Sequence, residues 1–238
     1  AVDAALLLVN RLITGGFGAT LLPSLELRDG VPAHLRTVVA IPTLLTTQAA
    51  IEEQIETLEV HHLSNPAGAI HFALLSDWTD ATAESMPEDA ALLATAVEGI
   101  ARLNRRYPAE AGVDRFFLLH RRRGWNEAQG AWIGWERKRG KLHELNHLLR
   151  GSTGTTFVPA PGASRALPAD VRYVVTLDSD TRLPRDAIVR LVGKMAHPLN
   201  RPRWDAGRRR VVEGYGVLQP RVTPSLPVGA EGSRFQRA

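Results

Sequence analysis

Short apolar runs alternate along this chain with segments in which apolar residues recur at helical spacing. The runs predicted to be strands are residues 37–43, 70–75, 115–120, 171–177 and 210–219. Several of them end at a proline or at polar residues, as buried strands bounded by turns do. Between them, residues such as Ile51, Ile55 and Leu58 share one face of a helix. This alternation predicts an α/β domain with a mainly parallel sheet flanked by helices.

Polar residues and prolines indicate where the helices begin. Thr46 or Thr47 suits the N-cap of the helix after the first strand. Pro87 lies where the first turn of the next helix tolerates proline. Further helices are predicted at residues 1–13, at residues 138–150 and from Pro184 onward. Residues 124–135 hold three Trp and three Gly, and we expect a loop or ribbon there.

The length of 238 residues suits one to two domains. We divide the chain into an N-terminal helix and linker (1–32), one α/β domain (33–227) and a Gly-rich truncated tail (228–238). The tail carries no packing element and residue 1 is not Met, so we expect a fragment of a longer protein. The apolar run at residues 4–9 is too short for a membrane span and lacks the charged head of a signal peptide.

Composition and charge narrow the classes of protein and partner. There are 29 Lys and Arg against 25 Asp and Glu, and a net charge of +4 does not by itself indicate nucleic-acid binding. The apolar fraction of 44% excludes wholesale disorder. The chain has no cysteine, which excludes a disulfide framework, a cysteine zinc finger and a cysteine nucleophile.

Carboxylates follow two of the predicted strands. Asp178 and Asp180 come directly after residues 171–177, and Asp77 ends the second strand. In open α/β sheets ligands bind outside the carboxyl ends of strands, and such a pair can share a hard cation completed by water and substrate phosphates. The alternative is a solvated turn. A phosphatase of the haloacid dehalogenase type fits poorly, since Arg182 stands where it needs Thr or Val.

Residues 143–147 read His-Glu-Leu-Asn-His on a predicted helix. In zinc metallopeptidases this spacing places two His on the metal and lets the Glu act as base. The surroundings give little support, because Lys141 precedes the motif and Arg150 and Thr153 replace the Gly and His of the extended pattern. A zinc metallopeptidase remains an alternative to a polar helix face with chance spacing.

Basic residues cluster at residues 121–123, 137–141 and 208–210. The cluster at 137–141 precedes a predicted helix, where main-chain amides and Lys make a site for an anion. The other two are read as solvated faces or contacts for acidic lipid. A basic module that binds lipid or nucleic acid is therefore a second alternative. The three Trp of residues 124–135 are either core residues or a platform on which sugar rings stack.

Taken in order, these pieces resemble a nucleotide-sugar glycosyltransferase of type A, of the cellulose-synthase-like kind. The matching pieces are residues 37–43 (its first strand), Asp77 (its uracil-contacting acid), Lys141 with Asn146 (its diphosphate element) and Asp178-Ser179-Asp180 (its Asp-x-Asp). Longer stretches resemble the glycosyltransferase domain of cyclic β-1,2-glucan synthase: residues 72–81, 116–146, 175–202 and 213–227. The resemblance covers about residues 25–227. It implies a Rossmann-like fold of glycosyltransferase type A that is incomplete at its C-terminus.

The resemblance also implies an inverting transfer from UDP-glucose with Mg²⁺ or Mn²⁺ as cofactor. Its donor-binding residues would be Thr43, Asp77, Arg139, Lys141 and Asp178. Asp180 would hold the metal, with Asp178 bridging towards metal or ribose. A cation and basic groups stabilise a departing diphosphate, while a carboxylate takes the proton from the acceptor hydroxyl.

By resemblance, the chain is one cytoplasmic-facing domain of a large bacterial inner-membrane synthase. Its partners would be the UDP-glucose donor, a β-1,2-glucan acceptor and the rest of that membrane-embedded protein, without nucleic acid. In the cellulose-synthase-like enzymes the catalytic base lies well beyond the Asp-x-Asp motif. By this resemblance, we expect the base past residue 238. Glu213 is a weak candidate within the chain. We therefore expect donor binding without a complete catalytic set.

Overall fold

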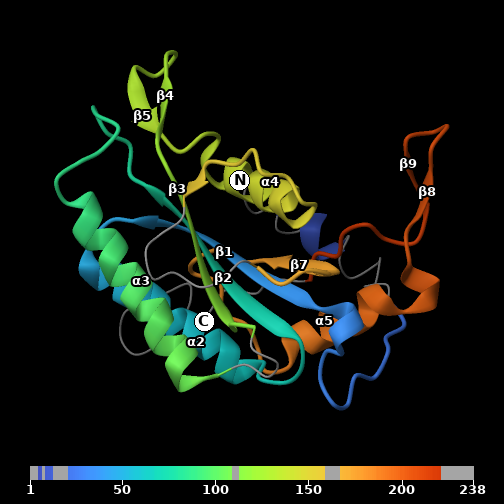
Figure 1. The fold of residues 1–238 in the computed structure, drawn as a ribbon. Helices are drawn as coiled ribbons and strands as arrows, with labels where there is room; N and C mark the ends of the chain where they lie inside the picture. Colours follow the sequence, from blue (N-terminus) through green and yellow to red (C-terminus); the bar gives the residue numbers. More distant parts are fainter. Residues whose placement is uncertain (1–4, 7–8, 13–20, 109–112, 159–166, 221–238) are drawn as a thin grey trace.

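The computed structural model describes residues 5–6, 9–12, 21–108, 113–158 and 167–220. Within these residues the central sheet has five strands in the order β6-β3-β2-β1-β7 (Figure 1). The strands are β1 (Thr37–Leu45), β2 (Ile70–Trp78), β3 (Phe116–Arg121), β6 (Phe157–Val158) and β7 (Tyr173–Thr176). The pairs β1–β2, β1–β7 and β2–β3 are parallel, and the short β6 is antiparallel to β3. The predicted mainly parallel α/β sheet is confirmed.

Helices cover both faces of this sheet (Figure 1). They are α2 (Gln48–Ser64), α3 (Asp89–Arg106), α4 (Arg137–Leu149) and α5 (Ala187–Ala196), with single turns η1 (Ala33–Leu35) and η3 (Pro198–Asn200). Apolar residues of α2, α3 and α5 form one core cluster with one face of the strands. Leu145 of α4 belongs to a second cluster on the other face.

The strands are continuously apolar because both of their faces are buried. Along β1, Val39 and Ile41 join the cluster beneath α2 and α3, while Val38 and Ala40 face Leu145. The strand also continues two residues past the predicted end to Leu45. Sheet alternation therefore assigns each residue of the apolar run to one of the two helix layers.

The first helix of the domain begins as its sequence predicts. The Thr47 side chain accepts a hydrogen bond from the Ala50 amide at 3.1 Å, which satisfies one main-chain donor of the first turn of α2. The Thr46 side chain instead lies against the cavity described below. The position of α2 relative to β1 is thus fixed at the edge where the site lies.

Two small hairpins project from the domain, one after β3 and one after α5 and η3 (Figure 1). One is β4 (Gly124–Asn126) with β5 (Ala131–Ile133), the ribbon predicted there. The other is β8 (Arg203–Asp205) with β9 (Arg210–Glu213). The predicted strand over residues 210–219 is wrong in extent and placement, because it ends at Glu213 and pairs only with β8. Gly214 has φ +68° and packs against the Arg201 carbonyl, so the chain turns away there.

The N-terminal part of the chain contacts the domain where it is described. Residues 5–6 and 9–12 are helical, within the helix predicted for residues 1–13. Val31 is buried in the core, and the Leu25 amide donates to the Gly193 carbonyl of α5 at 3.1 Å. The predicted tail at residues 228–238 lies outside the described residues. In the part that is described, no helix combines the length and the apolar character that crossing a bilayer requires.

Candidate functional site

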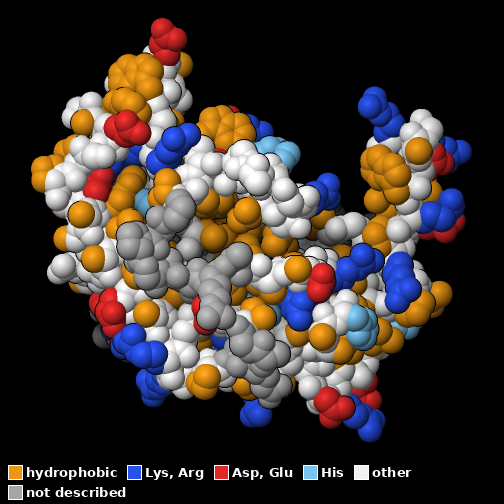
Figure 2. Space-filling view, viewed as in Figure 1, with side chains coloured by type: hydrophobic (Ala, Val, Ile, Leu, Met, Phe, Trp, Pro, Cys, Tyr) orange, Lys and Arg blue, Asp and Glu red, His pale blue; other side chains and the backbone are white. Residues whose placement is uncertain are grey.

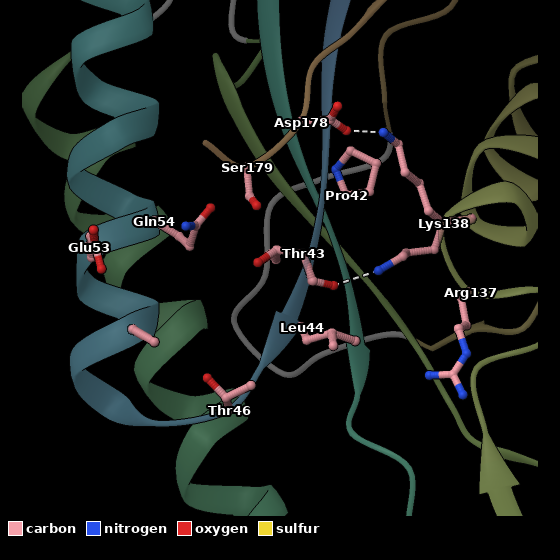
Figure 3. A pocket seen from close by; sticks show the side chains of 12 residues that line it. Pro42, Thr43, Leu44, Thr46, Glu53, Gln54, Arg137, Lys138, Asp178 and Ser179 are labelled. Atoms are coloured by element: carbon pink, nitrogen blue, oxygen red, sulfur yellow. Dashed lines mark hydrogen bonds and ion pairs between the residues drawn. The ribbon is translucent and has the colours of Figure 1, made fainter. Parts of the chain in front are cut away.

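A cavity of about 430 Å³ opens at the carboxyl end of β1, between α2 and the start of α4 (Figure 3). Thr43 comes from β1, Arg137, Lys138 and Lys141 come from α4, and Asp178 follows β7. Because β1 and β7 are parallel neighbours, their carboxyl ends meet at one edge of the sheet. Three of the predicted donor-binding residues, Thr43, Lys141 and Asp178, therefore line one cavity.

Lys141 reaches the cavity from the buried face of α4. Its ammonium donates to the Thr43 carbonyl at 2.5 Å and lies 3.3 Å from Asp77 Oδ2. Burial lowers the pKa of the Lys141 ammonium, and the nearby Asp77 carboxylate only partly offsets this. An ammonium has three N–H donors, so these two contacts leave one donor for an anion in the cavity.

Behind the cavity, Arg121 forms a buried ion-pair network. Its Nε and Nη2 donate to the two Asp77 oxygens at 2.7 and 2.8 Å, and its Nη1 donates to Glu144 at 2.8 Å. The guanidinium is entirely inaccessible to solvent. Burial lowers the pKa of Arg121, but the hydrogen bonds and charges of Asp77 and Glu144 outweigh it and the pKa is raised.

The reading of residues 121–123 as a solvated basic face is therefore wrong for two of the three. Arg123 is also buried, with hydrogen bonds of 2.5 and 3.1 Å to Asp89. The strand register of the structure, which the sequence alone does not give, accounts for the position of Arg121. Ser76 is level with His120 on the neighbouring strand, which places Asp77 level with Arg121 and pairs opposite charges.

Asp77 lies behind the cavity rather than in its lining. Both of its oxygens accept hydrogen bonds from Arg121, and Lys141 is next to one of them. Two glycines make room for this arrangement. A Cβ at Gly134 would lie 2.5 Å from Asp77 Oδ2, and one at Gly140 would lie 2.9 Å from Arg121 Nη1. The contact with uracil predicted for Asp77 stays a prediction.

Asp178 is an exposed residue of the cavity lining, and the remaining predicted residues, Arg139 and Asp180, lie outside the lining. Asp178 forms an ion pair with Lys138. Arg139 is exposed, pairs with Glu136 at 2.8 Å and does not line the cavity, and Asp180 is exposed and also outside the lining. The sequence reasoning gave no separate role to Lys138, and only its place in the basic cluster pointed to it.

The side chains near the cavity decide which kind of metal ion they could hold. Among the described residues there is no cluster of three or more His, Cys, Asp or Glu that could hold an ion. Asp178 and Asp180 are two exposed carboxylates, so a hard cation held by them would need phosphates and water as its other ligands. For that, Asp178 would exchange its contact with Lys138 for the cation.

The alternatives considered from the sequence fit the geometry less well. Glu144 is buried and accepts hydrogen bonds from Arg121 and from the Thr156 amide at 2.6 Å, whereas His143 and His147 are exposed on α4. The Glu and the two His of the predicted zinc motif thus point away from each other. Glu213 is held by Arg203 at 2.5 and 2.9 Å, and this hydrogen bond lowers the pKa of the Glu213 carboxyl, which weakens it as a base.

The parallel sheet, with its cavity at the carboxyl end of the first strand, defines a Rossmann-like α/β domain consistent with the glycosyltransferase type A fold. No family model matches the chain. Over 237 of its 238 residues, the chain is 51% identical to the cyclic β-(1,2)-glucan synthase NdvB of Rhizobium meliloti (strain 1021). It spans 8% of that protein. The resemblance drawn from the sequence stretches is confirmed.

Proposed function

We propose that this domain binds UDP-glucose together with Mg²⁺ or Mn²⁺ and serves as an inverting glucosyltransferase in β-1,2-glucan synthesis. The observation that carries the proposal is the cavity where Thr43, Lys141 and Asp178, from three separate parts of the chain, meet. The 51% identity to a segment of a cyclic β-(1,2)-glucan synthase supports the same reading.

The electrostatics of the cavity suit an anionic donor. The first two turns of α4 carry Arg137, Lys138 and Lys141, all of which line the cavity. The helix dipole also favours negative charge at this end of the helix. Lys141 is held in place before any ligand arrives, by Thr43 and Asp77. Fixed donors of this kind stabilise developing charge without the cost of reorganisation. We therefore assign the diphosphate to the α4 side of the cavity.

The other donor contacts follow from position. We assign the uracil and ribose to the β1 side, with Thr43 in the wall and Asp77 behind it. Arg139 is assigned an outer contact with the diphosphate. Asp178 and Asp180 would hold the cation, which supplies charge neutralisation on the departing diphosphate when it is bound.

Transfer also needs a base and a path for the acceptor glucan. We propose that further parts of a membrane-embedded synthase, with this domain on its cytoplasmic face, supply them. Glu213, on the β8–β9 hairpin, is already paired with Arg203, which leaves it poorly suited to proton abstraction.

Calorimetric titration of UDP into the intact protein, with and without Mn²⁺, tests the proposal. We expect binding that depends on Mn²⁺, loss of that dependence in Asp180→Ala, and at least tenfold weaker binding in Lys141→Met. Lys194→Met, a change in α5 away from the cavity, is the matched control and should bind as the parent does. Equal UDP affinity with and without Mn²⁺, unchanged in Asp180→Ala, would refute the proposed site.

A further inference from the structure

The β4–β5 hairpin presents aromatic surface to solvent in the part of the chain that is described. Trp125 and Trp132 lie directly opposite each other on its two strands, with ring centroids 6.0 Å apart and planes inclined by 60°. Such a cross-strand pair stabilises a ribbon, yet Trp125 keeps 55% of its surface exposed. The pairing therefore leaves much of the Trp125 ring free to contact a ligand.

The hairpin stands beside the cavity. It follows β3 at the carboxyl edge of the sheet, and main-chain hydrogen bonds of 2.9 and 3.0 Å join Trp132 to Ala81, just beyond β2. The chain then runs from β5 directly into α4, whose first residue, Arg137, lines the cavity. A ligand that extends out of the cavity along this edge would reach the hairpin (Figure 1).

The polar groups around the aromatic pair distinguish between partners. Asn126 lies beside Trp125, and Glu127 and Gln129 are exposed in the turn. Figure 2 shows acidic atoms at the tip of this projection. The β8–β9 hairpin instead combines exposed Trp204 with the basic residues 208–210. An acidic tip opposes an anionic lipid surface, whereas flat rings beside amide and carboxylate groups suit a neutral sugar, with its apolar face and its hydroxyls.

We propose that the β4–β5 hairpin is a binding platform for a β-glucan chain, with a pyranose ring on Trp125. It would hold the acceptor or growing product beside the donor cavity. The identity of the polymer as β-1,2-linked rests on the proposed function. The inference of a sugar-binding platform rests only on the geometry and exposure of the hairpin.

Hydroxyl-radical footprinting of the intact protein, with linear β-1,2-gluco-oligosaccharides as the probe, tests this platform locally. We expect the probe to lower oxidation of Trp125 by roughly fivefold. Trp204 is 62% exposed on the other hairpin and serves as the matched control, whose oxidation should not change. Trp125→Tyr keeps a flat ring and should bind the probe within about twofold of the parent. Trp125→Val keeps strand propensity without a ring and should lose the binding.

The outcomes separate the platform from the donor site. Protection of Trp125 while UDP fails to bind would support the platform and remove the proposed function. Unchanged Trp125 oxidation, equal binding by Trp125→Val and the parent, or protection by vesicles of anionic phospholipid without protection by the oligosaccharide would each overturn the platform.

Discussion

Arg121 contributes to the stability of the fold by neutralising two buried carboxylates. Removing it would leave Glu144 buried without its ion-pair partner and would leave Asp77 with Lys141 alone, because this guanidinium holds both carboxylates. We expect Arg121→Met to lower the free energy of unfolding by about 3–5 kcal/mol, measured by urea denaturation. The exposed neighbour gives the control, since Arg122→Met should change it by less than about 0.5 kcal/mol. Equal losses in the two variants would show that the network adds nothing.

Gly140 lies on the face of α4 that packs against this network. A Cβ there would lie 1.9 Å from the Trp135 carbonyl oxygen, a contact that only a backbone shift relieves. We expect Gly140→Ala to cost about 1–3 kcal/mol of stability and to weaken UDP binding, because the shift moves Lys141. At Gly154 the nearest neighbouring atom would be 4.0 Å from the added Cβ. Gly154→Ala should therefore leave both the unfolding midpoint and UDP affinity unchanged, and a similar loss at both glycines would contradict the explanation.

In the proposed metal site, Lys138 would compete with the cation for Asp178, with which it forms an ion pair. The two side chains are more than half exposed, and such pairs contribute about 0.2–1 kcal/mol. Without UDP, Lys138→Ala should therefore bind Mn²⁺ up to about fivefold more tightly, as read by titration calorimetry. With Mn²⁺ present, the same variant should bind UDP more weakly, since the cavity loses a cation. If Mn²⁺ affinity fell instead, Asp178 would not be a metal ligand.

At the scale of elements, α2 packs on the sheet through a buried histidine. The His62 ring contacts Phe72, Tyr107 and Phe116 edge-on. Burial lowers the pKa of His62 to about 4, helped by the charge of Arg115. The unfolded chain, with a histidine pKa near 6.5, therefore binds more protons than the folded chain between pH 6.5 and 4. Stability should be complete above about pH 6.5 and fall as the pH drops towards 4.

Thermal unfolding measured at several pH values checks this packing effect. His62→Phe fits the aromatic cluster and cannot be protonated, so it should make the fall in midpoint shallower. The fall should not vanish, because burial also lowers the pKa of His120 to about 4. His34 is exposed, and His34→Phe should reproduce the pH dependence of the parent. An unaltered slope in His62→Phe would mean that burial does not lower the pKa of this ring in the folded domain.

The elements that sequence reasoning captured best are those whose burial is complete on both faces. Strands β1, β2 and β3 consist mostly of buried apolar residues, because helices cover the sheet on each side. The strand predicted at residues 171–177 is shorter, since β7 lies at the edge of the described sheet and is only partly buried. The predicted strand at 210–219 carried no comparable burial signal, and it turned out to be half of the β8–β9 hairpin.

At the scale of the whole molecule, the sequence predicts those site residues that follow directly from the order of the parallel strands. Parallel neighbours bring Thr43 and Asp178 to one edge. The start of α4 is less predictable, because Glu136 and Arg137 adopt positive φ values of 51° and 47° and thereby set which basic residues face the cavity. Such left-handed conformations are uncommon outside Gly, so spacing alone does not reveal them. This is why Lys138 lines the cavity while Arg139 lies outside it.

The anchor of Lys141 on β1 is a main-chain carbonyl, that of Thr43. Every amino acid carries this acceptor, so a side-chain substitution at position 43 does not remove it. Thr43→Ala therefore removes a hydroxyl from the cavity wall while the lysine keeps its tether. A change in affinity in that variant reports on the ligand alone. Only an ester in place of the peptide bond after Thr43, whose carbonyl is a weaker acceptor, would loosen the tether itself.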